Sequence, residues 1–286
     1  MKIGVIGNGF VGKATCALHN KDIDIIVYDL DPQLCDPMGC TLKDLKQCEL
    51  IFVSVPTPMN KDGSCHLGIV ESVINNLNNN NVIAEPDNFV VIRSTVIPGT
   101  CDRLGCYFMP EFLTEKSYLE DFKNCKEWVF GLKGINTDHD QIFMNKINKL
   151  FTLAKTNQCI ISNSTNFVPN KTAEMVKYFR NCFLALKISF CNEIYDYCRL
   201  QGINYEDVRQ LATKDERIGP SHTAVPGHDG KRGFGGTCFP KDTKALLSSM
   251  ADIGMPSYIF EAMNDRNDRS DRIEQDWNSN VGRSVI

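Results

Sequence analysis

Hydrophobic residues follow two different patterns along this chain, and the change falls shortly after its midpoint. In the first half, short apolar and β-branched runs alternate with stretches of helical periodicity. Such runs are typical of strands buried on both faces, and their alternation with helices indicates βαβ units and a parallel sheet. We expect strands over residues 2–6, 23–28, 50–55, 89–93, 128–132 and 159–162. We expect helical segments from about residue 11 and over residues 42–46, 67–77 and 138–151.

From about residue 168 onward, long helical patterns replace the alternation. Residues 172–200 carry apolar side chains at a period of about 3.6, in a stripe wide enough to be buried on more than one side. A loop rich in glycine and proline follows at residues 219–236, and residues 259–273 alternate charges as a solvated helix face does. The sequence therefore predicts an α/β domain over residues 1–167 and an all-helical central region over residues 168–286.

Composition and charge exclude several classes of partner. The 286 residues, 42% of them hydrophobic, are enough to bury a sizeable core, and a formal net charge of -4 gives no footprint for nucleic acid or an anionic membrane. No apolar stretch reaches the roughly 18 to 20 residues that span a bilayer, and the N-terminus has no signal-peptide pattern, so we expect a cytoplasmic protein. The 13 cysteines include no C-x-x-C and the 5 histidines show no ligand spacing. We therefore expect reduced thiols and no metal.

A glycine-rich motif connects the first predicted strand to the first predicted helix. Gly7-Asn8-Gly9-Phe10-Val11-Gly12 matches the G-x-G-x-x-G fingerprint of dinucleotide binding, in the strand-to-helix position that the fingerprint requires. Asp29 ends the second predicted strand, where a carboxylate binds the ribose 2′-hydroxyl of NAD and repels the 2′-phosphate of NADP. The sequence thus predicts a Rossmann-type doubly wound sheet that binds NAD through Gly7, Gly9, Phe10, Val11, Gly12 and Asp29. A glycine-rich turn without a ligand is the alternative.

Four further segments resemble motifs of the UDP-glucose/GDP-mannose dehydrogenase family, in the family's order and approximate spacing. They are Val55-Pro56-Thr57-Pro58, Ser94-Thr95-Val96-Ile97-Pro98-Gly99-Thr100, Pro110-Glu111-Phe112-Leu113 and Gly233-Phe234-Gly235-Gly236-Thr237-Cys238-Phe239-Pro240-Lys241-Asp242. The resemblance covers nearly the whole chain. It implies an NAD-binding domain, a central helical dimerisation region and normally a second nucleotide-binding domain for the substrate. This sequence ends inside or just beyond the central helices, so we expect that last domain to be missing and substrate binding to be weak.

The chemistry that the resemblance implies is a four-electron oxidation of a nucleotide sugar's primary alcohol to a carboxylate, with two NAD used in succession. Cys238 would be the nucleophile. Its attack on the aldehyde would give a thiohemiacetal, a second oxidation would give a thioester, and water would release the acid. The cations Lys231, Arg232, Lys241 and Lys244 would favour the thiolate if they lie near it in space. An inert buried cysteine is the alternative.

The resemblance also implies roles for residues around this nucleophile. Lys177 and Asn181 would orient the substrate hydroxyl and stabilise an oxyanion, and their spacing of four places both on one helix face. Glu111 and Asp242 would transfer protons through a water molecule that Thr95 holds. Pro56, Thr57, Thr95 and Lys241 would add to the cofactor site. The substrate site would combine Lys177 and Asn181 with Phe112, Leu113, Phe234, Gly235 and Arg217, of which Arg217 would reach a neighbouring subunit's substrate.

Each of these roles has a structural alternative. Lys177 would then be a helix-surface lysine, Arg217 would form a surface salt bridge, and Asn181 and Glu111 would cap helices. For the whole chain, the leading hypothesis is an NAD-dependent nucleotide-sugar 6-dehydrogenase that forms a homodimer, with UDP-glucose as the expected substrate. The rivals are a hydroxyacid-type dehydrogenase that performs one oxidation without a covalent step, and a non-catalytic NAD-binding protein. Neither rival explains the loop that carries Cys238.

Overall fold

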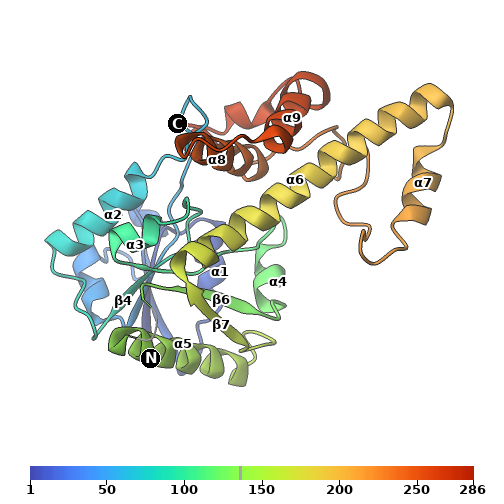
Figure 1. The fold of residues 1–286 in the computed structure, drawn as a ribbon. Helices are drawn as coiled ribbons and strands as arrows, with labels where there is room; N and C mark the ends of the chain where they lie inside the picture. Colours follow the sequence, from blue (N-terminus) through green and yellow to red (C-terminus); the bar gives the residue numbers. More distant parts are fainter. Residues whose placement is uncertain (135–136) are drawn as a thin grey trace. The chain divides into compact units, whose positions relative to one another are not determined.

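The computed structural model, drawn in Figure 1, describes residues 1–134 and 137–286, which fold into two compact units. The first comprises Met1–Thr57 and Leu67–Lys177, and the second comprises Pro58–His66 and Tyr178–Ile286. The predicted domain boundary after residue 167 stays a prediction. It falls inside the last strand of the first unit, and the helix that follows this strand contributes to both units.

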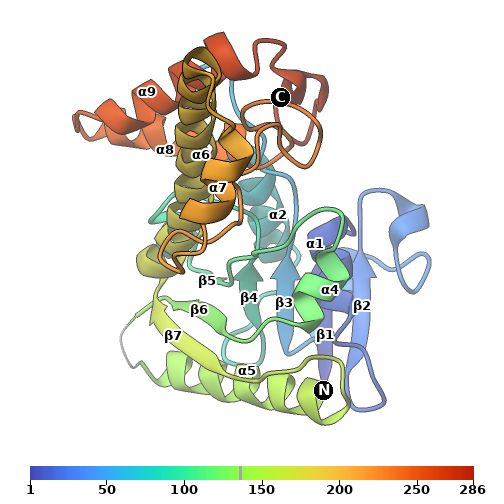
Figure 2. The same ribbon diagram turned by 90° about the vertical axis from the view of Figure 1, so that its right-hand side faces the viewer.

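A seven-stranded sheet forms the centre of the first unit, in the order β2-β1-β3-β4-β5-β6-β7 (Figure 2). The strands are β1 (Lys2–Ile6), β2 (Asp24–Tyr28), β3 (Leu50–Val53), β4 (Phe89–Ile92), β5 (Tyr107–Phe108), β6 (Trp128–Leu132) and β7 (Thr165–Pro169). Neighbouring strands run parallel except β5 and β6, which are antiparallel. The predicted Rossmann-type doubly wound sheet is confirmed, and the antiparallel pair corrects the expectation of a wholly parallel one.

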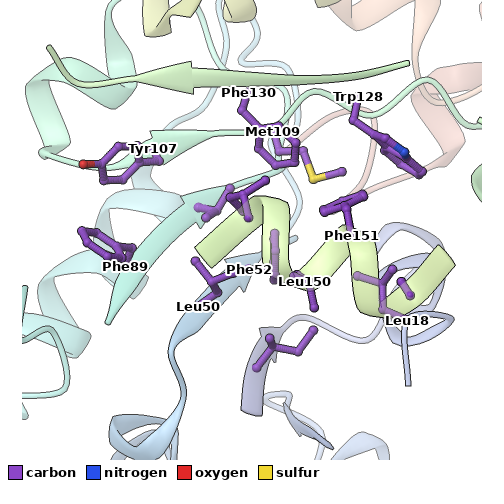
Figure 3. Packing of buried hydrophobic residues seen from close by; sticks show 14 of the residues in the cluster. Leu18, Leu50, Phe52, Phe89, Tyr107, Met109, Trp128, Phe130, Leu150 and Phe151 are labelled. Carbon is purple, nitrogen blue, oxygen red and sulfur yellow. The ribbon is translucent and has the colours of Figure 1, made fainter. Parts of the chain in front are cut away.

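Each central strand contributes side chains to two separate cores. Phe52 of β3 packs into one core while Ile51 and Val53 pack into the other, because successive strand residues face opposite sides of a sheet. Figure 3 shows the first core, which contains Phe52 and Leu150. This core is covered by α1 (Phe10–Cys16), α4 (Tyr118–Lys123) and α5 (Asp138–Thr156); the second is covered by η2 (Leu42–Gln47), α2 (Gly68–Asn79) and α3 (Thr100–Leu104). Burial on both faces explains the continuous apolar runs in the sequence.

Helix α5 shows how local sequence fixes an element of this layer. A capping box begins it: Thr137 Oγ1 accepts a hydrogen bond from Asp140 N at 3.1 Å, and Asp140 Oδ2 accepts one from Thr137 N at 3.2 Å. Phe143, Ile147 and Leu150 then recur at intervals of four and three, which places them on one buried face. The predicted helix over residues 138–151 is confirmed and continues to residue 156.

The strand predicted over residues 159–162 is wrong. This segment closes α5 instead: Gln158 adopts a left-handed φ of 60°, and Cys159 N donates to Ala154 O at 2.9 Å. Ile160 is buried, whereas Ile161 is 52% exposed. The strand that completes the sheet is β7, whose mixed sequence is typical of an edge strand and gave no apolar signal.

The second unit is helical. It contains most of α6 (Asn170–Gln201), together with α7 (Tyr205–Ala212), α8 (Phe239–Asp252), α9 (Tyr258–Arg266), the π-helical turn η3 (Asn267–Asp271) and η4 (Asp276–Ser279). The short segment at residues 58–66 joins this unit because Met59 N donates to Ser284 O at 2.8 Å and Ile286 N donates to Met59 O at 3.1 Å. In residues 1–134 and 137–286, no helix combines the length and apolar character needed to cross a membrane.

Replacement of Phe130 by alanine should strongly destabilise the first unit. Phe130 is fully buried, and its ring centroid lies 5.4 Å from that of Phe151 and 5.6 Å from that of Phe167. Truncation leaves a cavity in this core, so Phe130→Ala should lower the free energy of unfolding by about 3–5 kcal/mol. Urea unfolding measures the change. Ile161→Ala, at a half-exposed turn position, is the control and should cost less than about 1 kcal/mol; equal losses would contradict this description of the core.

Candidate functional site

The glycine-rich loop leaves β1 at the point where the order of the sheet reverses, since β2 lies on one side of β1 and β3 on the other. Open α/β sheets bind ligands at such a switch point, beyond the carboxyl ends of the strands. A Cβ atom at Gly12 would lie 1.9 Å from Gly7 O, so glycine is required where α1 passes the loop. A Cβ atom at Gly9 would meet no heavy atom of the described residues within 4 Å. The backbone at Gly9 is therefore open to a phosphate group.

Asp29 lies beside this loop, and its carboxylate is held by backbone groups. Asn8 N donates to Asp29 Oδ2 at 2.7 Å, and Asp31 N donates to Asp29 Oδ1 at 3.0 Å. The Asn8 side chain also donates to Leu34 O at 2.7 Å, which ties the glycine-rich loop to the loop after β2. Each carboxylate oxygen has a second lone pair, so both can still accept a hydrogen bond from a ribose hydroxyl. These residues, with Phe10 and Val11 opening α1, fit the dinucleotide that the sequence predicts.

Two further loops meet at the carboxyl ends of the neighbouring strands β3 and β4. Ser94 Oγ donates to Val55 O at 2.6 Å and joins them. Pro56 is exposed on the first loop, whereas Thr57 and Thr95 are buried. The structure therefore brings together the two motifs that the sequence predicted for the cofactor and for the catalytic water.

Two buried charged residues lie beside the Thr95 loop or hold it, and neither was predicted from the sequence. Arg93 donates from Nη1 to the Thr15 hydroxyl and to Val11 O at 3.3 Å, and its burial lowers the pKa of its guanidinium to about 10. Glu174 accepts hydrogen bonds from Gly99 N and from Cys101 N, the latter at 2.8 Å. Glu174 thereby anchors the loop to α6, three residues before Lys177. A charge inside an otherwise apolar pattern was the available signal.

Glu111 and Lys177 form a buried ion pair in the first unit. Lys177 Nζ lies 2.6 Å from Glu111 Oε1, and the two side chains are 4% and 5% exposed. Leu113 N donates to Glu111 Oε2 at 2.8 Å. Burial acts to raise the pKa of Glu111, but the charge of Lys177, these hydrogen bonds and Arg93 outweigh it, so the pKa lies below its ordinary value. Glu111 is therefore a carboxylate at neutral pH, and Phe112 and Leu113 beside it are half-buried.

Asp242 is the centre of a polar cluster in the second unit. It is almost fully buried, and Asn181 Nδ2 donates to its Oδ2 at 2.6 Å while Lys241 Nζ lies 2.5 Å from its Oδ1. Burial of Lys241 acts to lower its pKa, but the charges of Asp242, Cys238 and Cys65 outweigh it and raise that pKa. Lys241 is thus a permanent cation whose pairing with Asp242 restricts where it can point.

Cys238 is the half-buried residue that precedes α8, one helical turn before Asp242. The interaction that raises the pKa of Lys241 is mutual, so the ammonium group favours a thiolate at Cys238. The other three cations expected around this thiol form ion pairs elsewhere: Lys231 with Asp276 at 2.8 Å, Arg232 with Asp271 at 2.8 Å and Lys244 with Asp268 at 2.6 Å. Each of these three cations is therefore paired with a carboxylate, whereas the charge of Lys241 acts on Cys238.

Three residues predicted for the substrate site have other contacts in this structure. The Phe234 side chain is buried in a cluster with Ala185 and Met263, and its backbone N and O are hydrogen-bonded to the Asn267 amide. Gly235 packs against the guanidinium of Arg272. Arg217 pairs with Asp215 at 2.5 Å and its side chain is 88% exposed, which is the surface ion pair named as its alternative. The substrate role of each stays a prediction.

Metal ligands give no competing interpretation. Within the residues that the structure describes, no group of three or more histidine, cysteine, aspartate or glutamate side chains is arranged to hold a metal ion. No disulfide bond is described between cysteines of residues 1–134 and 137–286. The residues described above supply one thiol, two carboxylates, two ammonium groups and one side-chain amide.

Family models and known relatives match most of the chain. The NAD binding domain of the UDP-glucose/GDP-mannose dehydrogenase family matches residues 38–152, and the central domain of the same family matches residues 171–269. The first match includes the Thr95 and Glu111 motifs, and the second includes Cys238. The first match confirms the prediction that the chain binds NAD. The glycine-rich loop lies before the matched residues, so its assignment to the cofactor rests on the loop geometry described above.

Curated relatives and a solved structure agree with these matches. UDP-glucose 6-dehydrogenase of Rickettsia felis is 33% identical over 77% of this chain and 48% of its own length. The enzyme of the same name from Pseudomonas aeruginosa is 29% identical over 94% of this chain and 66% of its own length. A UDP-glucose dehydrogenase structure from Pyrobaculum islandicum has a TM-score of 0.75 at 25% identity and covers 93% of this chain and 68% of that one. The chain spans about half to two thirds of the length of these relatives.

Replacement of Glu111 by glutamine should cost stability in a pH-dependent way. The pKa of Glu111 is lowered by folding, so its charged form contributes stability that is fully present above the unfolded value of 4.5 and is lost as pH falls through the lower folded value. Glutamine resembles the protonated acid and leaves Lys177 unpaired. Glu111→Gln should therefore lower the free energy of unfolding by about 3 kcal/mol at pH 7 and by much less near pH 3.

Urea unfolding at several pH values measures this difference. Glu120→Gln is the matched control, because Glu120 lies on the surface of the same unit. A Glu111→Gln penalty that is constant from pH 7 to pH 3 would contradict a Glu111 pKa that folding lowers.

Proposed function

This chain belongs to the UDP-glucose/GDP-mannose dehydrogenase family, and we propose that it oxidises the primary alcohol of a nucleotide sugar to a carboxylate with NAD. The observation that carries the proposal is the cluster around Asp242. The half-buried Cys238 thiol precedes α8, and Lys241 on the next turn favours its thiolate. Asp242, which pairs with Lys241, also accepts a hydrogen bond from Asn181. A simple hydroxyacid dehydrogenase has no use for such a thiol. The names of the relatives make UDP-glucose the first substrate to test.

In the first oxidation, the alcohol carbon loses a hydride and its hydroxyl loses a proton. NAD, when bound, supplies the hydride acceptor. In the proposed step a carboxylate, Glu111 or Asp242, accepts the proton through water, and the Lys177 ammonium and Asn181 amide hold the oxygen as its negative charge develops. Both side chains sit on α6, four residues apart, with their nitrogens fixed by Glu111 and Asp242.

The second oxidation needs the product aldehyde to stay on the protein. The Cys238 thiolate forms a C–S bond to the aldehyde carbon, and the resulting alkoxide is stabilised by Lys177 and Asn181. Loss of a second hydride from this thiohemiacetal gives a thioester. Water, deprotonated by a carboxylate, then breaks the C–S bond and returns the thiolate. The balance is two NAD reduced and one water consumed for each acid formed.

Replacement of Cys238 tests this proposal directly. In Cys238→Ala, acid formation from UDP-glucose should fall by roughly 1000-fold or more, because the aldehyde is no longer retained. A trace of aldehyde with one NADH per turnover can persist, since the first oxidation does not need the thiol. Acid product and NADH are measured together, with NAD binding and thermal unfolding as folding controls.

The matched control is Cys159→Ala, a half-buried thiol of the first unit that should keep two NADH per acid. Acid formation by Cys238→Ala at the wild-type rate would reject the covalent mechanism. One NADH per turnover in the wild type would favour the single-oxidation rival, and no NADH with any nucleotide sugar would favour a non-catalytic protein.

We also propose a homodimer, as the sequence suggested. The apolar stripe of α6 is not wholly covered within the described chain: Phe183 is 56% exposed, Phe190 is 62% exposed and Tyr197 is 60% exposed. Their spacing of seven places them on one side of the helix. Tyr258 and Ile259, at the start of α9, are also exposed. Exposed apolar surface of this kind is typical of a surface that a second subunit covers. The cytoplasmic location likewise stays a prediction.

Charges placed on this stripe should separate the subunits. The double variant Phe183→Glu, Phe190→Glu puts two carboxylates where an apolar contact is proposed. The dissociation constant of the dimer should therefore rise at least tenfold. Light scattering coupled to size exclusion measures the mass at micromolar concentration. Ile161→Glu, at a half-exposed site in the first unit, should leave the mass unchanged. A wild type that is monomeric under these conditions contradicts the proposal.

A further inference from the structure

An asparagine from the end of α9 holds the backbone of the loop that leads to Cys238. Asn267 is fully buried at the start of η3. Its Oδ1 accepts a hydrogen bond from Phe234 N at 2.8 Å, and its Nδ2 donates one to Phe234 O at 3.0 Å. The amide therefore satisfies both backbone groups of Phe234, as a neighbouring strand would. The Phe234 ring is buried as well, which fixes the loop four residues before the thiol.

The loop passes this anchor through a narrow space. A Cβ atom at Gly235 would lie 2.4 Å from Arg272 Nη2, so no larger residue fits there without moving the guanidinium. That guanidinium cannot move cheaply, because it donates to Arg232 O at 3.2 Å, to Asp229 at 2.6 Å and to Asp276 at 2.9 Å. The route of the backbone from Phe234 toward Cys238 is thus set by packing as well as by hydrogen bonds.

A second asparagine of the same segment holds the other side of Cys238. Thr243 Oγ1 donates to Asn264 Oδ1 at 2.8 Å, and both side chains are buried. Asn264 Nδ2 donates in turn to Phe260 O at 2.9 Å, which fixes the orientation of the amide. Asn264 and Asn267 lie three residues apart, and they bind the chain five residues after and four residues before the thiol.

We propose that Asn267 and Asn264 are positioning residues for Cys238, which together set the place of its sulfur relative to Asn181 and Asp242. This inference rests on the proposed role of Cys238 as the nucleophile. A turn held at both ends keeps the sulfur where the aldehyde carbon must be attacked, and a displacement of about 1 Å in such a geometry can cost on the order of 100-fold in rate.

The test replaces the anchor and measures both turnover and the thiol itself. In Asn267→Ala, kcat with UDP-glucose should fall at least tenfold while KM stays within about twofold, because orientation is lost and ground-state binding is kept. Iodoacetamide should alkylate Cys238 at least threefold faster, because the released loop opens more often. Trypsin yields residues 233–241 as a peptide whose one cysteine is Cys238, so mass spectrometry can follow this thiol among the 13.

Two further variants keep the test decisive. Asn267→Asp has the same size and keeps the acceptor but loses the donor to Phe234 O, so it should fold and show the same direction of change. Asn88→Ala is the matched control: Asn88 in the first unit makes the same kind of clamp, accepting from Ala84 N at 2.8 Å and donating to Val82 O at 2.7 Å. It should lose stability without any change in the alkylation of Cys238.

The outcomes separate this inference from the proposed function. An unchanged Cys238 alkylation rate in both Asn267 variants overturns the positioning role, as does an equal change in Asn88→Ala. A wild type without dehydrogenase activity, combined with faster alkylation in the Asn267 variants, would reject the proposed function and leave the anchoring of the Cys238 loop supported. Lower kcat, unchanged KM and faster alkylation together support both.

Discussion

The need to pair a row of buried polar side chains on α6 governs the geometry of this protein. Asn170, Glu174, Lys177 and Asn181 follow one another at intervals of four, three and four, so they form one stripe along the helix, and all are buried. An unpaired buried amide costs a few kcal/mol, and an unpaired buried charge costs more. Each member of the stripe must therefore meet a partner from another segment if the helix is to be buried at all.

The partners of this stripe are the site loops themselves. Glu174 accepts from the backbone of the loop after Thr95, Lys177 pairs with Glu111, and Asn181 donates to Asp242. Rotation of the helix by one residue would turn the stripe by about 100° and leave these charges unpaired, so the register of α6 is fixed. The same bonds that make burial of the helix tolerable fix the side-chain nitrogens of Lys177 and Asn181, which the proposed function assigns to the substrate oxygen. Stability and site geometry thus have a single cause.

Most cations near Cys238 in sequence form ion pairs that stabilise its loop, whereas the sequence suggested that they would favour its thiolate. Four cations close to Cys238 in sequence could activate its thiolate, yet Arg232 joins Arg266 around the carboxylate of Asp271. Burial raises the pKa of Asp271 and the two arginines oppose this, so the cluster holds a costly charge by surrounding it. These local cations stabilise the fold of the loop, and the charge of Lys241 acts on the thiol.

Most strands of the sheet, the long helix and the motifs could be predicted from the sequence, because strand burial, helical period and glycine spacing are local properties. It placed Lys177 and Asn181 on one helix face for the same reason, and it identified Cys238 by a resemblance that needs no coordinates. It misplaced the last strand, since an edge strand such as β7 has no apolar pattern, and the Ile160 segment is apolar for another reason: it closes α5. Which charges meet could not be predicted from the sequence, because an ion pair such as Glu111–Lys177 joins segments that are far apart along the chain. Such a pair forms only where folding buries both side chains at the same place.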